Sequence, residues 1–482
     1  MAGKNIHAFL VSFPCQGHVN PLLRLGRRLA ALGALVTFCT PEAAGVSIRK
    51  ANSITDDGRP TPYGRGAIRF QFFDDGWDFD SPNRDDLPAY FSQIEVAGRV
   101  KLPQLIHKEA EAGRPISCLI NSPFVTWVSD VAESFSIPNA VLWTLSCACF
   151  SAFYHYHNGL VPFPTEREPE MEVQLPHVPL LRHDELPANL HPHNTHVYIR
   201  DVILALFRNL SIPFCVLMDT FEELEGENIE YMSRILGRPI RTLGPLFKDL
   251  ESELESKKES KALRADFFKA EDCIEWLDSK PPRSVVYISF GSVVHLQQEQ
   301  VDEIANALAE SEVAFLWVVR PPAREMNSKP HVLPGGFLDK VGDRGRIVQW
   351  SPQEEVLAHP STACFMTHCG WNSTMEALAS GVPVVAFPHW GDQVTNAKFM
   401  VDVFKVGVRM CKGGEAEGRV VPRDEVASLL EEVVRGPRAE EIRANALKWK
   451  KAAEAAVAEG GSSYMNMQCF VEEIARFNLV PN

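Results

Sequence analysis

The sequence predicts an α/β protein built from two units, each a parallel β-sheet flanked by helices. The first observation is a buried strand, a turn, an amphipathic helix and a second strand close to the N-terminus. The second is that the same order of elements starts again near residue 284. Between them, Lys248–Asp266 is rich in Lys, Glu, Asp and Ser and poor in apolar residues. Alternating strands and helices favour parallel sheets, and a polar stretch of this kind is typical of a linker.

The first half opens with a strand–turn–helix pattern. Ile6–Phe13 is mostly apolar and is broken by the turn Pro14-Cys15-Gln16-Gly17-His18. Pro21 suits the first turn of a helix, and leucines recur on one face before Gly33 ends it. The further elements expected in this half are strands at Leu35–Cys39, Cys118–Asn121 and Ala140–Thr144 and a helix near Trp127–Phe135.

The second half repeats this architecture without repeating its residues. Ser284–Phe290 is a β-branched strand, turned by Gly291-Ser292 and followed by an amphipathic helix over about Gln298–Ser311. Phe315–Arg320 is the next strand. After Arg438 a charged helix runs to about Glu459, Gly460-Gly461 breaks it, and a last helix presents Met465, Phe470, Ile474 and Phe477, which need a surface to dock on.

These patterns predict four regions. Residues 1–245 form an N-terminal domain, 246–270 a charged linker, 271–460 a C-terminal domain, and 461–482 a final helix.

Composition excludes several classes of function. The formal net charge of −14 argues against nucleic-acid and anionic-membrane partners, which select basic surfaces. The 11 cysteines show no CxxC pair or metal-ligand spacing, which favours a reducing cytoplasm over a disulfide framework. No apolar run reaches the ~20 residues of a membrane span, and no signal peptide is expected.

Trp350–Gln393 contains the most informative turn. Ala363–Thr367 is a strand, His368-Cys369-Gly370-Trp371 a tight turn, and Asn372–Ala379 a helix ended by Gly381 and Pro383. Such a helix start offers free N–H groups and a positive dipole to phosphates, which does not require a basic surface. His368, Asn372 and Ser373 can add donors, and Glu376 can accept from ribose hydroxyls.

Structural explanations of the same residues remain open. Ser373-x-x-Glu376 also reads as a capping box. Trp350 can stack on a uracil ring or belong to a core, and Asp392-Gln393 can bind sugar hydroxyls or cap a helix.

The whole segment from Trp350 through His368-x-Gly370-Trp371-Asn372-Ser373 and Glu376 to Gln393 closely resembles the signature box of plant UDP-dependent glycosyltransferases. The resemblance extends over the chain, from Pro14-x-x-Gly17-His18-x-x-Pro21 to Phe290-Gly291-Ser292 and the terminal helix. It implies the GT-B type of fold: two Rossmann-like domains facing across a cleft, with the last helix crossing back to the N-terminal domain.

The resemblance also implies roles for individual residues. Trp350 would stack on uracil, Gln353 and Glu376 contact the ribose, and Asp392 and Gln393 hold the sugar; the closing glutamine indicates glucose. The diphosphate would be bound around Trp371 by Ser292, His368, Asn372 and Ser373. His18 would be the general base, which suits an imidazole at a helix start. The implied reaction is inverting and needs no metal or other cofactor beyond the donor substrate UDP-glucose.

One departure from the family pattern bears on the acceptor. Many relatives have an aspartate that orients the histidine, at the position of Ser122 in Cys118–Phe124. A phenol, with a pKa of about 10, needs strong base catalysis, whereas a carboxylic acid with a pKa of about 4 is already ionised at pH 7. The sequence therefore favours a glucose ester of a hydroxycinnamic or benzoic-type acid, and Asn121-x-Pro123-Phe124 resembles the ester-forming branch.

Several alternatives stay open. O- or C-glucosylation of a flavonoid or another polyphenol is consistent with the same box, and a non-catalytic sugar-nucleotide binder is the alternative of another class. A dinucleotide oxidoreductase is disfavoured because neither unit opens with GxGxxG.

Asn121, Ser122 and Phe124 are the candidate acceptor residues. His191, His193 and His196 have metal-like spacing but lack a carboxylate or cysteine partner, so an acceptor-side loop is favoured. The protein is expected to be a cytoplasmic monomer of plant secondary metabolism.

Overall fold

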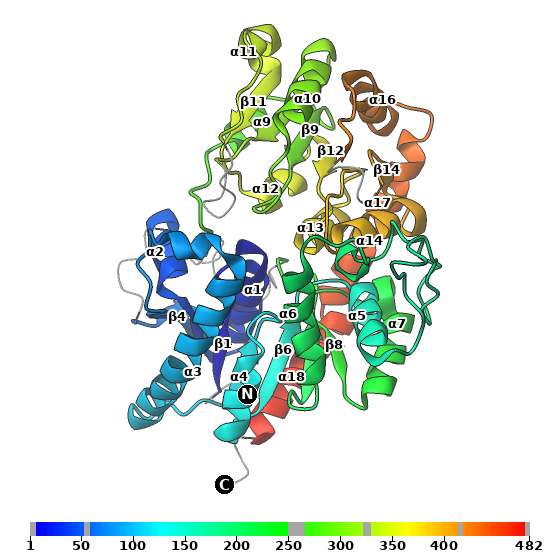
Figure 1. Ribbon diagram of the computed structural model, residues 1–482. Coiled ribbons are helices and arrows are strands. Elements are labelled where there is room, and N and C mark those ends of the chain that lie inside the picture. Colours follow the sequence, from blue (N-terminus) through cyan, green and yellow to red (C-terminus); the bar gives the residue numbers. More distant parts are fainter. Residues whose placement is uncertain (1–5, 53–57, 249–265, 322–328, 413–417, 478–482) are drawn as a thin grey trace. The chain divides into compact units, whose positions relative to one another are not determined.

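The computed structural model describes residues 6–52, 58–248, 266–321, 329–412 and 418–477 (Figure 1). The chain divides into two compact units. The first comprises Met1–His157, Val197–Lys269 and Ala455–Asn482, and the second Asn158–His196 and Ala270–Glu454. Most of the expected linker, residues 249–265, lies outside the described residues.

The first unit is built on an eight-stranded sheet in the order β3-β4-β2-β1-β5-β6-β7-β8. Every neighbouring pair is parallel except β3 with β4. The strands are β1 (His7–Val11), β2 (Leu35–Pro41), β3 (Thr61–Tyr63), β4 (Gly66–Phe73), β5 (Cys118–Asn121), β6 (Asn139–Trp143), β7 (Cys215–Met218) and β8 (Ile240–Thr242). The helices are α1 (Gln16–Ala31), α2 (Glu42–Asn52), η1 (Pro82–Asp85), α3 (Leu87–Glu111), α4 (Trp127–Ser134), α5 (Cys147–Asn158), α6 (Val197–Arg208), α7 (Glu222–Leu236) and α18 (Ser462–Phe477).

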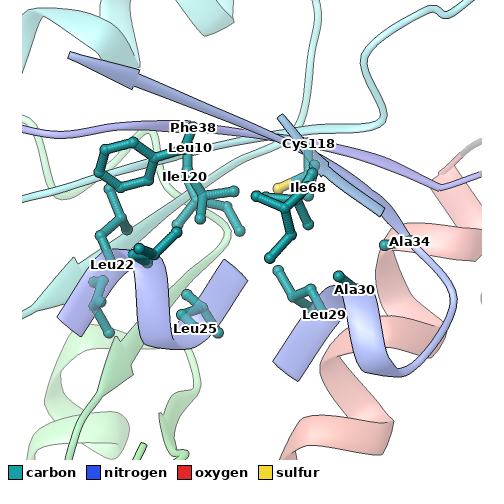
Figure 2. Packing of buried hydrophobic residues seen from close by; sticks show 14 of the residues in the cluster. Leu10, Leu22, Leu25, Leu29, Ala30, Ala34, Phe38, Ile68, Cys118 and Ile120 are labelled. Atoms are coloured by element: carbon teal, nitrogen blue, oxygen red, sulfur yellow. The ribbon is translucent and has the colours of Figure 1, made fainter. Parts of the chain in front are cut away.

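Helices cover both faces of this sheet because successive residues of a strand point to opposite sides. Leu10 of β1 joins a core with Leu22, Leu25 and Leu29 of α1, and Figure 2 shows these side chains facing one another. The neighbouring Phe9 joins a second core with residues of α3 and α4. Each of these buried apolar side chains contributes roughly 1.5–3 kcal/mol, so α1 is held firmly and the turn before it has a defined position.

The last helix, α18, packs on the first unit beside β8 (Figure 1). Phe470 and Ile474 are fully buried in its core, as expected, and Met467 and Val471 join them. Phe477 is 42% exposed, yet its ring lies against Phe214 with centroids 5.1 Å apart, so it also belongs to the docking face. Met465 was wrongly placed there, since it is 50% exposed. The return of the C-terminal helix to the N-terminal domain is confirmed.

The second unit has a six-stranded, entirely parallel sheet in the order β11-β10-β9-β12-β13-β14. Its strands are β9 (Val285–Ser289), β10 (Ala314–Val318), β11 (Gly345–Val348), β12 (Thr362–Thr367), β13 (Val384–Ala386) and β14 (Gly407–Arg409). The helices are η2 (Ala188–Leu190), α9 (Ile274–Asp278), α10 (Gln298–Glu310), α11 (Phe337–Val341), η4 (Gly342–Arg344), α12 (Gln353–Ala358), α13 (Trp371–Ser380), α14 (Gln393–Lys398), the π-helical η5 (Phe399–Val403), α16 (Arg423–Val434) and α17 (Ala439–Val457).

The segment 158–196 groups with the second unit, whereas the sequence-based boundary places it in the first. Glu185 is buried at 2% exposure and lies 3.3 Å from the Lys398 ammonium and 3.6 Å from the Arg409 guanidinium. The backbone is joined as well: the Ala188 amide donates to the Gly391 carbonyl at 2.8 Å. These are long-range contacts of an irregular, Pro-rich stretch, and periodicity in the sequence does not report them.

Over the described residues, no helix combines the length and the apolar character needed to cross a bilayer. All eleven cysteines lie among these residues, and each is a free thiol.

Candidate active site

Three loops of the second unit meet at one edge of its sheet. They follow β9, β12 and β13, which are adjacent and parallel, so their carboxyl ends share that edge. Ligands of open α/β sheets bind outside these ends. The loops carry Ser292, then His368 to Gly370, and then His389 to Gln393. Candidate residues far apart in sequence are thus brought together.

The turn between β12 and α13 leaves the start of the helix without a side-chain cap. Cys369 has a φ of +64°, and Gly370 is the N-cap residue with no side-chain hydrogen bond to the helix. Ser373 is the third helical residue, so Ser373 and Glu376 do not form a capping box. The first turn of α13 contains no acidic residue of its own. The Trp371 amide at its start donates to the Asp392 carboxylate, which shows that this positive end favours an anionic group.

Gln353 connects the candidate ribose residues. Its Nε2 donates to Ser373 Oγ at 2.9 Å and to Glu376 Oε2 at 2.6 Å. Its Oε1 accepts from the hydroxyl of Tyr287 at 2.9 Å, and that hydroxyl is also 2.8 Å from Ser351 Oγ. Burial raises the pKa of Tyr287, which keeps the phenol protonated and able to donate.

Sequence reasoning missed Tyr287 and Ser351. The available signal was Tyr287 itself, the one aromatic hydroxyl within the buried strand β9.

The two tryptophans of the box have different environments. Trp371 is buried at 3% exposure as the first residue of α13. Trp350 is half-buried directly after β11, and its carbonyl accepts from the Glu271 amide at 2.9 Å. Of the two, Trp350 has ring surface left for stacking.

His368 fits into a notch between two glycines. A Cβ added at Gly291 would lie 2.5 Å from its Cε1, and one added at Gly370 would lie 2.5 Å from its Nε2. Gly291 also has a φ of +70°, which disfavours other residues. Burial, then His389 and Arg320, lower the pKa of His368 to about 3. The ring is therefore neutral at pH 7 and has one N–H to donate.

His389 was not a candidate in the sequence but lies close to His368. Burial lowers its pKa to about 4, and its Nε2 has no hydrogen-bond partner among the described residues. Two neutral imidazoles thus lie near the start of α13, where a protonated pair would be disfavoured.

The loop after β13 orders Asp392 and Gln393. Gln393 Oε1 accepts from the amides of His389 at 3.0 Å and Trp390 at 3.4 Å, which fixes the turn. Asp392 precedes α14 but makes no capping bond to it. Burial raises the pKa of Asp392 to about 6, although hydrogen bonds from Asn396, at 2.6 Å, and from the Trp371 amide favour its charged form. Ser292 and Asn372 are half-buried at the same sheet edge.

In the first unit, His18 is the third residue of α1 and is 8% exposed. Its ring centroid lies 4.2 Å from that of Phe124 and 6.0 Å from that of Phe13. Burial lowers the pKa of His18 to about 3, and its Nδ1 has no hydrogen-bond partner among the described residues. The imidazole is therefore a neutral proton acceptor whose charged form is poorly stabilised.

The candidate acceptor residues divide into two kinds. Asn121 and Ser122 are fully buried: Asn121 Oδ1 accepts from Asn139 at 2.9 Å, and Ser122 Oγ accepts from the Phe13 amide at 3.1 Å. Phe124 is half-buried and faces Phe91, with centroids 5.5 Å apart. Phe91 in turn stacks on Phe13 at 4.2 Å. Phe124 was an acceptor candidate from the sequence, but its packing with Phe13 and Phe91 was not predicted, because α3 brings Phe91 from far along the chain.

The histidines of the 183–196 loop do not gather into a metal-type group. His191 Nε2 contacts the Pro169 carbonyl at 3.1 Å, and His196 lies against the Trp390 ring with centroids 5.3 Å apart. In the described part of the chain, no three His, Cys, Asp or Glu side chains are arranged to hold a metal ion.

Comparison with known proteins identifies the family. Residues 263–446, most of the second unit, match the family model described as UDP-glucoronosyl and UDP-glucosyl transferase. The chain is 61% identical over 469 residues to gallate 1-beta-glucosyltransferase of Quercus robur, covering 97% of this chain and 90% of the relative. It is 59% identical over 474 residues to cinnamate beta-D-glucosyltransferase of Fragaria ananassa, covering 98% and 83%.

Among solved structures, Os79 from O. sativa in complex with UDP has a TM-score of 0.80 and 31% identity, covering 97% of this chain and 100% of that one. The fold class expected from the sequence, GT-B, is confirmed. A chain this similar to glucosyltransferases over almost its whole length is a UDP-glycosyltransferase and belongs to the UDP-glucosyl transferase family.

Proposed function

We propose that the protein transfers glucose from UDP-glucose to the carboxylate of an aromatic acid and releases a β-glucose ester and UDP. The observation that carries this proposal is the environment of His18. The imidazole is buried, its pKa is lowered to about 3, and the buried Ser122 stands where the family resemblance implies an orienting aspartate in many members. An acceptor that is already ionised at pH 7 does not require such a histidine to hold a full positive charge.

The proposed acceptor class is supported by the relatives. Those named above act on gallate and cinnamate, both aromatic carboxylates. The half-buried ring of Phe124 beside His18, supported from behind by the buried rings of Phe13 and Phe91, provides a surface against which an aromatic acid can pack.

On the donor side, we assign Trp350 to the uracil and the Gln353–Glu376 pair to the ribose. Ser292, His368, Asn372, Ser373 and the start of α13 would bind the diphosphate, and Asp392 and Gln393 the glucose. The acceptor carboxylate attacks the anomeric carbon from the side opposite the diphosphate, the bond to UDP breaks, and the configuration inverts. The charge that develops on the departing diphosphate is stabilised by preorganised donors. We infer that this arrangement works without a metal ion.

The proposal is tested with pairs of acceptors. Each aromatic acid is compared with the phenol that lacks its carboxyl group, and UDP release is measured against hydrolysis of the donor alone. The expected products from the acids are cleaved by mild alkali, as esters are. Products that resist alkali would replace this proposal with O- or C-glucosylation, and no UDP above the hydrolysis level with any acceptor would leave a sugar-nucleotide binder.

We further infer that the protein works as a cytoplasmic monomer. Eleven free thiols, nine of them buried, suit a reducing compartment. Sedimentation at micromolar concentration tests the monomer, and a fluorescent fusion tests the compartment.

A further inference from the structure

Arg320 lies at the sheet edge where the donor loops meet, although nothing in the site assigned above includes it. It follows β10, the neighbour of β9, and is 7% exposed. Its guanidinium donates through Nε to the Gly291 carbonyl at 2.9 Å and through Nη2 to the Val294 carbonyl at 2.8 Å. Its Nη1 donates to the Pro321 carbonyl at 3.1 Å. One side chain therefore clamps both ends of the loop that contains Ser292.

These bonds determine which way the loop presents its amides. In a planar trans peptide the C=O and the N–H point in opposite directions. Because the Gly291 carbonyl points at Arg320, the Ser292 N–H points away from it. By the same geometry, the Val294 carbonyl turns the His295 N–H away from the guanidinium. The structure gives the Ser292 amide no acceptor among the described residues, so this donor is oriented and available.

The charge of Arg320 also lies close to the phosphate residues. The loop it clamps includes Gly291, against which the His368 ring is packed. A guanidinium remains protonated at all relevant pH values, and its planar fork can bind several carbonyls at once, which a lysine cannot. In a protein of net charge −14, a fixed local cation helps to hold an anionic ligand.

We propose that Arg320 is a positioning residue for the donor diphosphate: by clamping the Gly291 and Val294 carbonyls it aims the Ser292 amide at a phosphate oxygen and adds a positive charge behind it. This rests on the proposed donor site at the start of α13. The role is indirect, because the guanidinium is occupied by carbonyls and acts through the loop.

The test compares binding of UDP and of uridine by calorimetry, because uridine lacks the diphosphate. Arg320→Lys keeps the charge but not the fork, and Arg320→Met removes both. Arg344→Met is the matched control, since Arg344 also donates to backbone carbonyls of this unit, those of Leu308 at 2.9 Å and Val313 at 3.0 Å. It precedes the amino end of β11, at the edge of the parallel sheet opposite to the donor loops. Thermal unfolding of every variant checks folding.

We expect Arg320→Lys to weaken UDP about tenfold and Arg320→Met more, with uridine affinity unchanged. Arg344→Met is expected to bind both ligands as the wild type does. The proposal is overturned if Arg320→Lys binds UDP normally, if UDP and uridine weaken together, or if Arg344→Met weakens UDP as much. A wild-type protein that binds uridine no worse than UDP would instead contradict the donor site itself.

Discussion

Replacing single side chains can test the acceptor side and the donor side of the proposed reaction separately. His18 would take the proton from a phenol, whereas a carboxylate acceptor has no proton to lose. Replacing His18 should therefore affect the two classes of acceptor differently. His18→Ala is expected to lower turnover on phenols by about 10²-fold or more and turnover on carboxylates by less than about tenfold. Initial rates with matched acceptors measure this, with His107→Ala, an exposed histidine of α3, as control. Equal losses on both acceptors would contradict the ionisation argument.

Tyr287 offers a second test at this scale. Its hydroxyl donates to Gln353 and contacts Ser351, so Tyr287→Phe leaves the candidate ribose pair without support. The KM for UDP-glucose is expected to rise about threefold to tenfold with little change in kcat, as for the loss of a neutral hydrogen bond. Tyr231→Phe, which loses a hydroxyl contact to His155 in the first unit, is the control. A drop in kcat at constant KM would rule out this role.

In the second unit, the loop after β9 leaves room for the His368 imidazole because residue 291 is a glycine. Gly291→Ala places a Cβ 2.5 Å from His368 Cε1 and strains a φ of +70°. UDP affinity is expected to fall at least about tenfold. Gly336→Ala has a φ of +73° but meets no atom within 4 Å, so it carries similar strain without the clash. If both variants lose affinity equally, backbone strain and not His368 explains the effect.

The contribution of α18 to the stability of the first unit can be tested at its buried residue Phe470. Phe470 is fully buried in the first unit, so Phe470→Ala should cost about 3–5 kcal/mol of that unit's stability. Met465→Ala, on the exposed side of the same helix, should change it by less than about 0.5 kcal/mol. Denaturant unfolding measures both. Similar midpoints for the two variants would mean that α18 is not an integral part of the core.

How much the sequence could predict also differs among elements. The strand and helix around His368 were predicted within one or two residues, because β-branched runs, helical spacing and glycine stops are local signals. The groups that prepare the site could not be predicted, since Tyr287, His389 and Arg320 act through contacts with residues far along the chain. The capping-box explanation of Ser373 failed for a similar reason: the helix begins at Trp371, and only the coordinates fix that register. The roles assigned to the site residues remain predictions.

For the whole molecule, buried histidines predict how stability changes with pH. Burial lowers the pKa of His18 and His368 to about 3 and that of His389 to about 4. Below pH ~6.5 the unfolded chain binds protons that the folded chain does not. Stability that is present above pH ~6.5 is therefore lost as the pH falls towards 4.

The size of this effect can be measured by urea unfolding at pH 7, 6 and 5. Each such histidine is expected to cost about 1–2 kcal/mol between pH 6.5 and 5. The His389→Gln variant lacks one of these histidines. Its free energy of unfolding should therefore fall less steeply between pH 7 and 5 than that of the wild type. An equally steep decline would show that His389 gains a proton without disturbing the fold.

The path of the chain between its two units has a practical consequence for recombining these enzymes. Because 158–196 belongs to the second unit and 455–482 to the first, the backbone passes from one unit to the other four times. A hybrid joined at residue 245 would pair the Glu185 of one parent with the Lys398 and Arg409 of another. Splice points near 157, 196, 269 and 454 would instead exchange each unit together with its own ion pairs. A protease that cuts any single link would leave two fragments that share at least one unit and stay associated only through non-covalent packing, since every cysteine is a free thiol.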